Sequence, residues 1–115
     1  MQDPQARLVV CLCAAWCYVC NDFRGAFDAL ARAHPAARFR WVDVEDDSAL
    51  IGEVDIENFP TLAVYRDGVP VFFGVVTPQP PVIARTLAAL FEGTPRPVAA
   101  PAQIVALPRA LEAPG

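Results

Sequence analysis

Two cysteines, Cys17 and Cys20, stand where the sequence changes from an apolar run to an amphipathic pattern. The run Leu8–Cys13 is typical of a buried strand, and the apolar residues that follow, such as Phe23 and Phe27, recur at helical spacing. The Cys-x-x-Cys pair would therefore open a helix, with its sulfurs about one turn apart. Because the free N–H groups at a helix start stabilise a thiolate, the pattern predicts thiol–disulfide exchange in which Cys17 attacks and Cys20 resolves.

Two further cysteines, Cys11 and Cys13, precede this pair and leave other interpretations open. The four cysteines could be ligands of one metal ion, or structural thiols. Against a metal site, Cys11 and Cys13 lie in the apolar run, where free cysteines often behave as small hydrophobic groups. The chain has one histidine and one serine, and it has no glycine-rich phosphate loop, so neither a Ser/His triad nor a nucleotide cofactor is expected. We expect no metal and no cofactor, and a redox role for Cys11 or Cys13 stays open.

The elements that must position these cysteines follow from hydrophobic periodicity and turn signals. A proline after His34 ends the first helix, Asp67-Gly68 indicates a hairpin, and Pro70 places the last strand at a sheet edge. The expected strands cover residues 6–13, 38–44, 61–66 and 69–73, and the expected helices cover 18–33, 48–53 and about 78–92, with Thr77 as a cap. The order β-α-β-α-β-β-α predicts an α/β protein with a four-stranded mixed sheet and helices on both faces.

The composition changes after Gly93. Residues 94–115 are rich in proline and alanine, with few large apolar side chains to offset the entropy of ordering. We therefore expect residues 1–93 to form one domain and residues 94–115 to be a flexible tail, with at most a turn of helix over 103–107.

Charge and hydropathy exclude several classes of protein. The formal net charge is −4, and all nine basic residues are arginines that are scattered along the chain, so nucleic-acid binding is not expected. The apolar run that ends at Cys13 is too short to span a membrane, and we read no signal peptide, which predicts a cytoplasmic protein without membrane contact. Acidic residues gather between residues 43 and 57. They are interpreted as a solvated surface or, alternatively, as a charged surface that selects basic partners.

The sequence resembles the thioredoxin family over roughly residues 6–92. The resemblance rests on Trp16-Cys17-x-x-Cys20, on Phe59-Pro60-Thr61 just before the third strand, and on the order of the elements. It implies a minimal thioredoxin-like domain that lacks the family's N-terminal strand and helix.

By this resemblance, Pro60 is a cis proline beside the Cys17–Cys20 redox centre, and Phe59 pairs through its backbone with the substrate. Together with Trp16 and Tyr18, these residues would form an apolar platform. The resemblance implies an oxidoreductase that acts on protein disulfides and receives electrons from a reductase or another dithiol. The alternative is a thioredoxin-fold interaction module with little redox activity.

Four positions differ from the family pattern. Tyr18-Val19 replaces the Gly-Pro dipeptide between the cysteines, and Cys11 and Trp41 occupy the positions of the aspartate and lysine that form the family's proton relay. We expect Cys11 to lie beneath Cys20 as a buried, inert thiol with a raised pKa. The alternative is that Cys11 is a third redox thiol, able to form a Cys11–Cys20 disulfide.

Overall fold

The apolar run of the first strand lies at the centre of the sheet. In the computed structural model, which describes residues 7–52, 54, 56 and 58–112, strand β1 (Arg7–Cys13) pairs in parallel with β2 (Arg38–Asp43) and antiparallel with β3 (Thr61–Arg66). Residues 8–13 are fully buried because helices cover both faces of this strand. Ala6, which the sequence places in the strand, lies outside the described residues.

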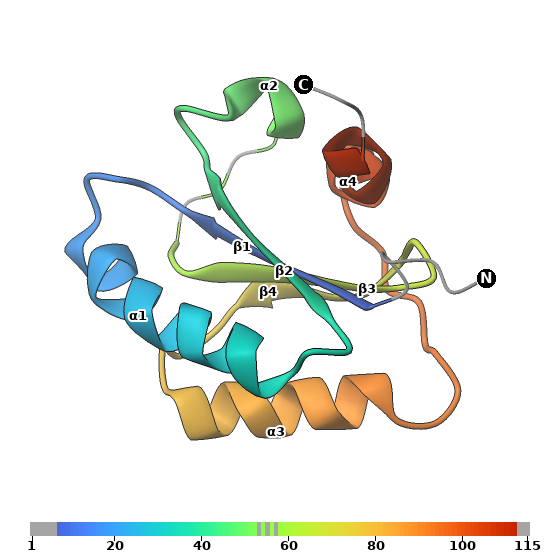
Figure 1. The fold of residues 1–115 in the computed structure, drawn as a ribbon. Coiled ribbons are helices and arrows are strands. Elements are labelled where there is room, and N and C mark those ends of the chain that lie inside the picture. The colour runs from blue at the N-terminus through green and yellow to red at the C-terminus, as the bar shows by residue number, and fades with distance from the viewer. Residues whose placement is uncertain (1–6, 53, 55, 57, 113–115) are drawn as a thin grey trace.

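The sheet is mixed and has the strand order β2-β1-β3-β4, with β4 (Val69–Val75) at one edge (Figure 1). The β3–β4 hairpin turns at Asp67 and Gly68, whose φ angles of 54° and 81° are the positive values that a tight two-residue hairpin turn needs. The edge position of β4 suits Pro70, which has no N–H to donate to a neighbour. The α/β fold and the four-stranded mixed sheet predicted from the sequence are confirmed.

Two helices cover one face of the sheet. Helix α1 (Tyr18–Ala33) buries Phe23, Phe27 and Leu30, and helix α3 (Pro80–Phe91) packs beside it. Alternate residues of β1 point toward these helices, as period-two strand geometry requires. Helix α3 begins after Gln79 rather than at the expected Thr77 cap, because Pro80 fits the first helical position, where no N–H is needed.

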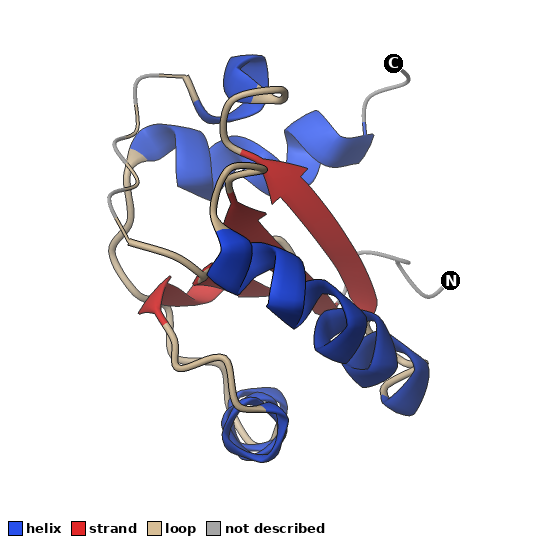
Figure 2. Cartoon of the chain, turned by 90° about the vertical axis from the view of Figure 1, so that its left-hand side faces the viewer, coloured by secondary structure: helices blue, strands red, loops and turns tan. Residues whose placement is uncertain are grey.

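The opposite face of the sheet is covered by α2 (Ser48–Ile51) and α4 (Ala102–Glu112) (Figure 2). Helix α2 is shorter than the sequence suggested and ends at Gly52, whose φ is 58°. Glu53, the last residue of the expected helix, lies outside the described residues.

Helix α4 differs from the flexible tail that the sequence suggested. Ile104 and Leu107 are fully buried and Leu111 is almost so, against the face of the sheet that includes Leu8 and Val10. The spacing of three and four residues places these side chains on one stripe, which the surrounding alanines and prolines obscured. The segment before α4 is held as well, since the Val98 N–H donates to the Pro70 carbonyl over 2.9 Å.

Candidate redox site

Cys17 lies in the tight turn between β1 and α1, as the N-cap of the helix. Its N–H donates to the Ala14 carbonyl over 3.0 Å, and its carbonyl accepts from the Asn21 N–H over 3.1 Å. The Asn21 side chain in turn donates to the Ala15 carbonyl, which braces the turn from the helix side. Cys17 is partly exposed and packs in part against the core, and it stands at the start of α1, where the N–H groups of the first helical turn have no partners within the helix.

Cys20 is fully buried one helical turn later, and the structure pairs it with Cys13 rather than with Cys17. The Cα atoms of Cys13 and Cys20 are 5.8 Å apart, within the usual range for a disulfide. In this state Cys17 is a free thiol. The expected Cys17–Cys20 disulfide is therefore not the one that the structure contains.

Cys13 also takes the place that the sequence suggested for Cys11. Both residues face α1, but Cys13 is the last residue of β1, and the first turn of α1 lies over that end of the strand. Cys11 lies two residues earlier on β1, and its sulfur is 3.6 Å from the Cys13 sulfur. The sequence signal for this arrangement is the position of Cys13 at the strand end, two residues after Cys11 and directly before the turn.

Burial dominates the chemistry of Cys11. It raises the pKa of the Cys11 thiol from an ordinary 9.0 to about 12, against a smaller opposing effect of the positive charge of Arg24. The Arg24 guanidinium lies 4.6 Å from the ring centre of Trp41, the residue that pairs with Cys11 on β2. Cys11 is therefore a neutral thiol at physiological pH, which agrees with the expectation of a raised pKa.

Aromatic side chains flank the exposed cysteine. Trp16 is 66% exposed, and its ring meets that of Phe59 edge-on with 5.6 Å between the ring centres. Tyr18 is more exposed still, and Pro60 is buried with a cis bond to Phe59. The Pro60 carbonyl accepts from the Val76 N–H over 3.0 Å, which holds this loop to the end of β4. The structure thus brings Trp16 and Phe59 together, while Tyr18 is exposed to solvent.

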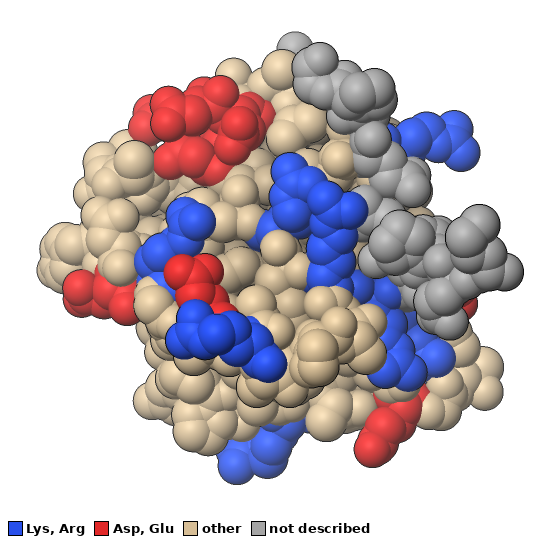
Figure 3. Space-filling model, viewed as in Figure 1, with Lys and Arg blue, Asp and Glu red and all other residues tan. Residues whose placement is uncertain are grey.

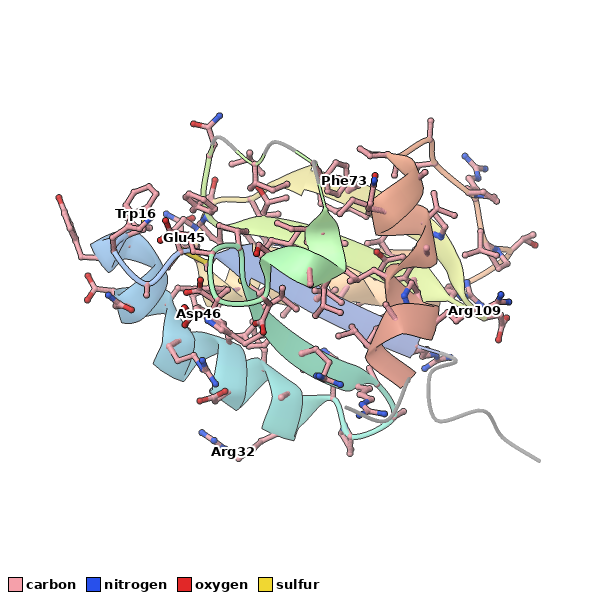
Figure 4. All side chains as sticks on the ribbon, turned by 90° about the horizontal axis from the view of Figure 1, so that it is seen from above. Trp16, Arg32, Glu45, Asp46, Phe73 and Arg109 are labelled. Atoms are coloured by element: carbon pink, nitrogen blue, oxygen red, sulfur yellow. A yellow bond between two sulfur atoms is a disulfide. The ribbon has the colours of Figure 1, made fainter. Side chains whose placement is uncertain are left out.

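Acidic side chains gather at the same end of the molecule, where β2 leads into α2 (Figures 3 and 4). The Val44 N–H donates to the Cys13 carbonyl over 2.8 Å, so this loop is tied directly to the cysteine-bearing strand. The hydrogen bond from the backbone N–H of Asp46 is the main cause that lowers the pKa of Asp43. Desolvation opposes it, and smaller effects of the N–H groups of Glu45 and Ala15 add to the lowering. Asp43 therefore organises the loop. Glu53, Asp55 and Glu57 of the acidic stretch lie outside the described residues.

Within the described ranges, no group of three or more His, Cys, Asp or Glu side chains is placed to hold a metal ion. No helix in that same part of the chain is long and apolar enough to cross a membrane.

The family model for thioredoxin matches residues 1–84. The chain belongs to the thioredoxin family. A sequence assigned as thioredoxin H10 in Arabidopsis thaliana is 36% identical over 61 residues, which are 53% of this chain and 40% of that protein. The thioredoxin-like protein CXXS1 of Oryza sativa is 30% identical over 54 residues, which are 47% of this chain and 41% of that protein. The match thus spans less than half the length of these thioredoxin relatives.

Solved thioredoxin structures share the fold. The oxidised mitochondrial thioredoxin 3 of Saccharomyces cerevisiae superposes with a TM-score of 0.65 at 23% identity, covering 75% of this chain and 80% of that one. Thioredoxin O2 of Arabidopsis thaliana, also oxidised, gives a TM-score of 0.64 at 22% identity, with 79% and 80% covered. At this level of identity, the structural likeness shows the thioredoxin fold alone.

Proposed function

We propose that this protein is a thiol–disulfide oxidoreductase that uses Cys17 and Cys20 to reduce or exchange disulfides in other proteins. The observation that carries the proposal is the contrast between the two cysteines. Cys17 is partly exposed at the start of α1, whereas Cys20 is buried one turn deeper. This arrangement gives one thiol that can meet a substrate and a second thiol that is shielded until the first has reacted.

The reaction begins with the dithiol form of the protein. The Cys17 thiolate attacks one sulfur of a substrate disulfide, forms a mixed disulfide and releases the other substrate sulfur as a thiolate. The Cys20 thiolate then attacks the Cys17 sulfur and releases the second substrate thiolate, and both released thiolates take protons from water. The substrate gains two electrons and the protein loses two, which a reductase or another dithiol must supply for the next cycle.

The apolar surface of Trp16 and Phe59 supports a protein substrate rather than a small one. The two rings pack against each other beside the turn that holds Cys17, and Trp16 remains largely exposed. An extended substrate chain can cover these rings, with the exposed Tyr18 at the margin of the contact. Pro60 is buried, so it would act by holding Phe59 in place and not by touching the substrate. We place the reaction in the cytoplasm, where thiols are kept reduced.

The test is the reduction of insulin disulfides with dithiothreitol as the electron donor. Wild-type protein should accelerate precipitation of the insulin B chain, and Cys17→Ser should fall to the dithiothreitol background. Cys11→Ala is the matched control, because it also removes one thiol but a buried one; it should retain activity. A folded wild-type dithiol that gives no rate above background would instead favour the interaction module.

A further inference from the structure

We propose that Cys13 is a third redox thiol, which takes the disulfide inward from Cys17–Cys20 to Cys13–Cys20 and leaves Cys17 free at the surface. The proposal rests on the proposed function for the formation of the outer disulfide. Its own basis is that the structure bonds Cys20 to Cys13 while Cys17 remains a thiol.

The geometry gives Cys20 two possible partners. Cys17 precedes it by one turn of α1, and Cys13 lies below that turn with its Cα atom 5.8 Å from that of Cys20. Cys13 and Cys20 are both fully buried, whereas Cys17 is partly exposed. Because Cys20 can form only one disulfide at a time, the three residues define an outer and an inner oxidised state.

The transfer is an exchange without net oxidation. Cys13 gives up its proton, and its thiolate attacks the Cys20 sulfur of the outer disulfide. The Cys13–Cys20 bond forms, the Cys17–Cys20 bond breaks, and Cys17 leaves as a thiolate that accepts the proton. The protein holds one disulfide before and after this step, so no further oxidant is required.

The surroundings favour the inner disulfide. In the inner state the two fully buried sulfurs of Cys13 and Cys20 are bonded to each other, while the residue that is released, Cys17, is partly exposed at the start of α1. Cys11 supports the exchange from the other side, because its neutral thiol lies 3.6 Å from the Cys13 sulfur and can donate a weak hydrogen bond to a Cys13 thiolate. Cys11 is thus a positioning residue, and Cys13 is the residue that reacts.

The inner disulfide changes what the surface can do. A dithiol protein resolves its mixed disulfide through Cys20 and releases the substrate. Once Cys20 is bonded to Cys13, Cys17 can still attack a substrate disulfide and release one substrate thiolate, but no resolving thiol remains beside it. The oxidised protein would therefore hold its partner as a lasting mixed disulfide until another thiol releases it.

Disulfide mapping of the full-length protein tests this proposal. The reduced protein is oxidised with one equivalent of a peptide disulfide, so that none remains to capture the released Cys17 thiol. Free thiols are then blocked with N-ethylmaleimide under native conditions, and chymotrypsin cuts after Trp16 and Tyr18. These cuts place Cys13, Cys17 and Cys20 on separate fragments. The expected product is a Cys13–Cys20 crosslink with label on Cys17. A final Cys17–Cys20 crosslink, with Cys17 unlabelled, would overturn the proposal.

Two variants separate the transfer from direct oxidation. In Cys13→Ser the outer disulfide should accumulate and protect Cys17 from the label. In Cys17→Ser the inner disulfide should form at least about tenfold more slowly, because no surface thiol accepts the oxidising equivalent. If the Cys13–Cys20 disulfide forms at the same rate in Cys17→Ser and in wild type, the transfer from Cys17–Cys20 is contradicted. The insulin assay tests the proposed function independently of the transfer. If the protein does not reduce insulin, the proposed function is wrong. If it reduces insulin but forms no Cys13–Cys20 crosslink, only the proposed role of Cys13 is wrong.

Discussion

The Tyr65 hydroxyl donates a hydrogen bond to the Ile104 carbonyl oxygen, and this contact joins the middle of the sheet to the last helix. The carbonyl of Ile104 would normally accept from the N–H of the residue four positions later, but that residue is Pro108, which has none. Tyr65 is fully buried and supplies the missing donor. The contact therefore makes a proline tolerable inside α4.

Tyr65→Phe should destabilise the protein by about 1–3 kcal/mol, because the buried carbonyl of Ile104 loses its donor while the ring volume is nearly unchanged. Urea unfolding of the two proteins measures this difference. A companion substitution, Pro108→Ala, restores a backbone N–H to the helix and should reduce the loss. If Tyr65→Phe unfolds at the same urea concentration as wild type, the hydrogen bond does not hold α4 in place.

Leu107→Ala should cost about 2–5 kcal/mol, because the side chain is fully buried between α4 and the sheet. Val105→Ala is the matched control on the same helix, since Val105 is 44% exposed, and it should change the stability little. The same unfolding measurement serves for both variants. Equal, small effects would show that α4 leaves the sheet in solution, as expected of a flexible tail.

The buried thiol of Cys11 predicts a loss of stability in alkali. Its pKa rises from about 9.0 to about 12 on folding, so between these values the unfolded chain ionises while the folded protein keeps the proton. The contribution of Cys11 to the free energy of unfolding should therefore be constant below about pH 9 and fall as the pH rises toward 12. Cys11→Ala should remove on the order of 1 kcal/mol per pH unit from this slope. Unfolding curves of both proteins between pH 8 and pH 11 measure how the free energy of unfolding changes with pH. An identical pH dependence in wild type and Cys11→Ala would contradict the prediction.

Trp16→Ala should lower kcat/KM for a peptide disulfide by about two- to tenfold, because the packed pair of Trp16 and Phe59 is lost from the substrate surface. The rate with hydroxyethyl disulfide, which is too small to cover the rings, should stay near the wild-type value. Trp16→Phe keeps an aromatic face and should retain most of the activity. An equal loss with both substrates would mean that Trp16 supports the turn around Cys17 and does not bind the substrate.

Much of the fold could be predicted from local patterns in the sequence. The continuous apolar run of β1, the Asp67-Gly68 turn and the stripe that includes Phe23 and Phe27 each specify one element through short-range physics. Of helix α4 only a possible turn over 103–107 was predicted, because its stripe consists of only three large apolar residues within a proline- and alanine-rich segment. Its stability depends on the sheet beneath it and on Tyr65, which is 39 residues away from Ile104.

The site was predicted in part: the environments of Cys17 and Cys20 could be inferred from local patterns, but the partner of Cys20 depends on contacts between distant elements. The exposure of Cys17 and the burial of Cys20 follow from the phase of the helix, which the sequence contains. The partner of Cys20 depends on which residue of β1 lies beneath the first turn of α1. A shift of two residues along the strand exchanges Cys11 for Cys13 without altering the face, so periodicity alone could not choose between them.

The central claim, that Cys17 is the thiol that attacks substrate disulfides, is tested most directly by trapping the mixed disulfide. In Cys20→Ser the resolving thiol is absent, so a peptide disulfide should leave one peptide attached to each chain. Digestion and mass spectrometry should locate that peptide on Cys17, and dithiothreitol should remove it. The double variant Cys17→Ser, Cys20→Ser should capture nothing. A peptide on Cys11 or Cys13, or no adduct on the folded Cys20→Ser protein, would contradict the account.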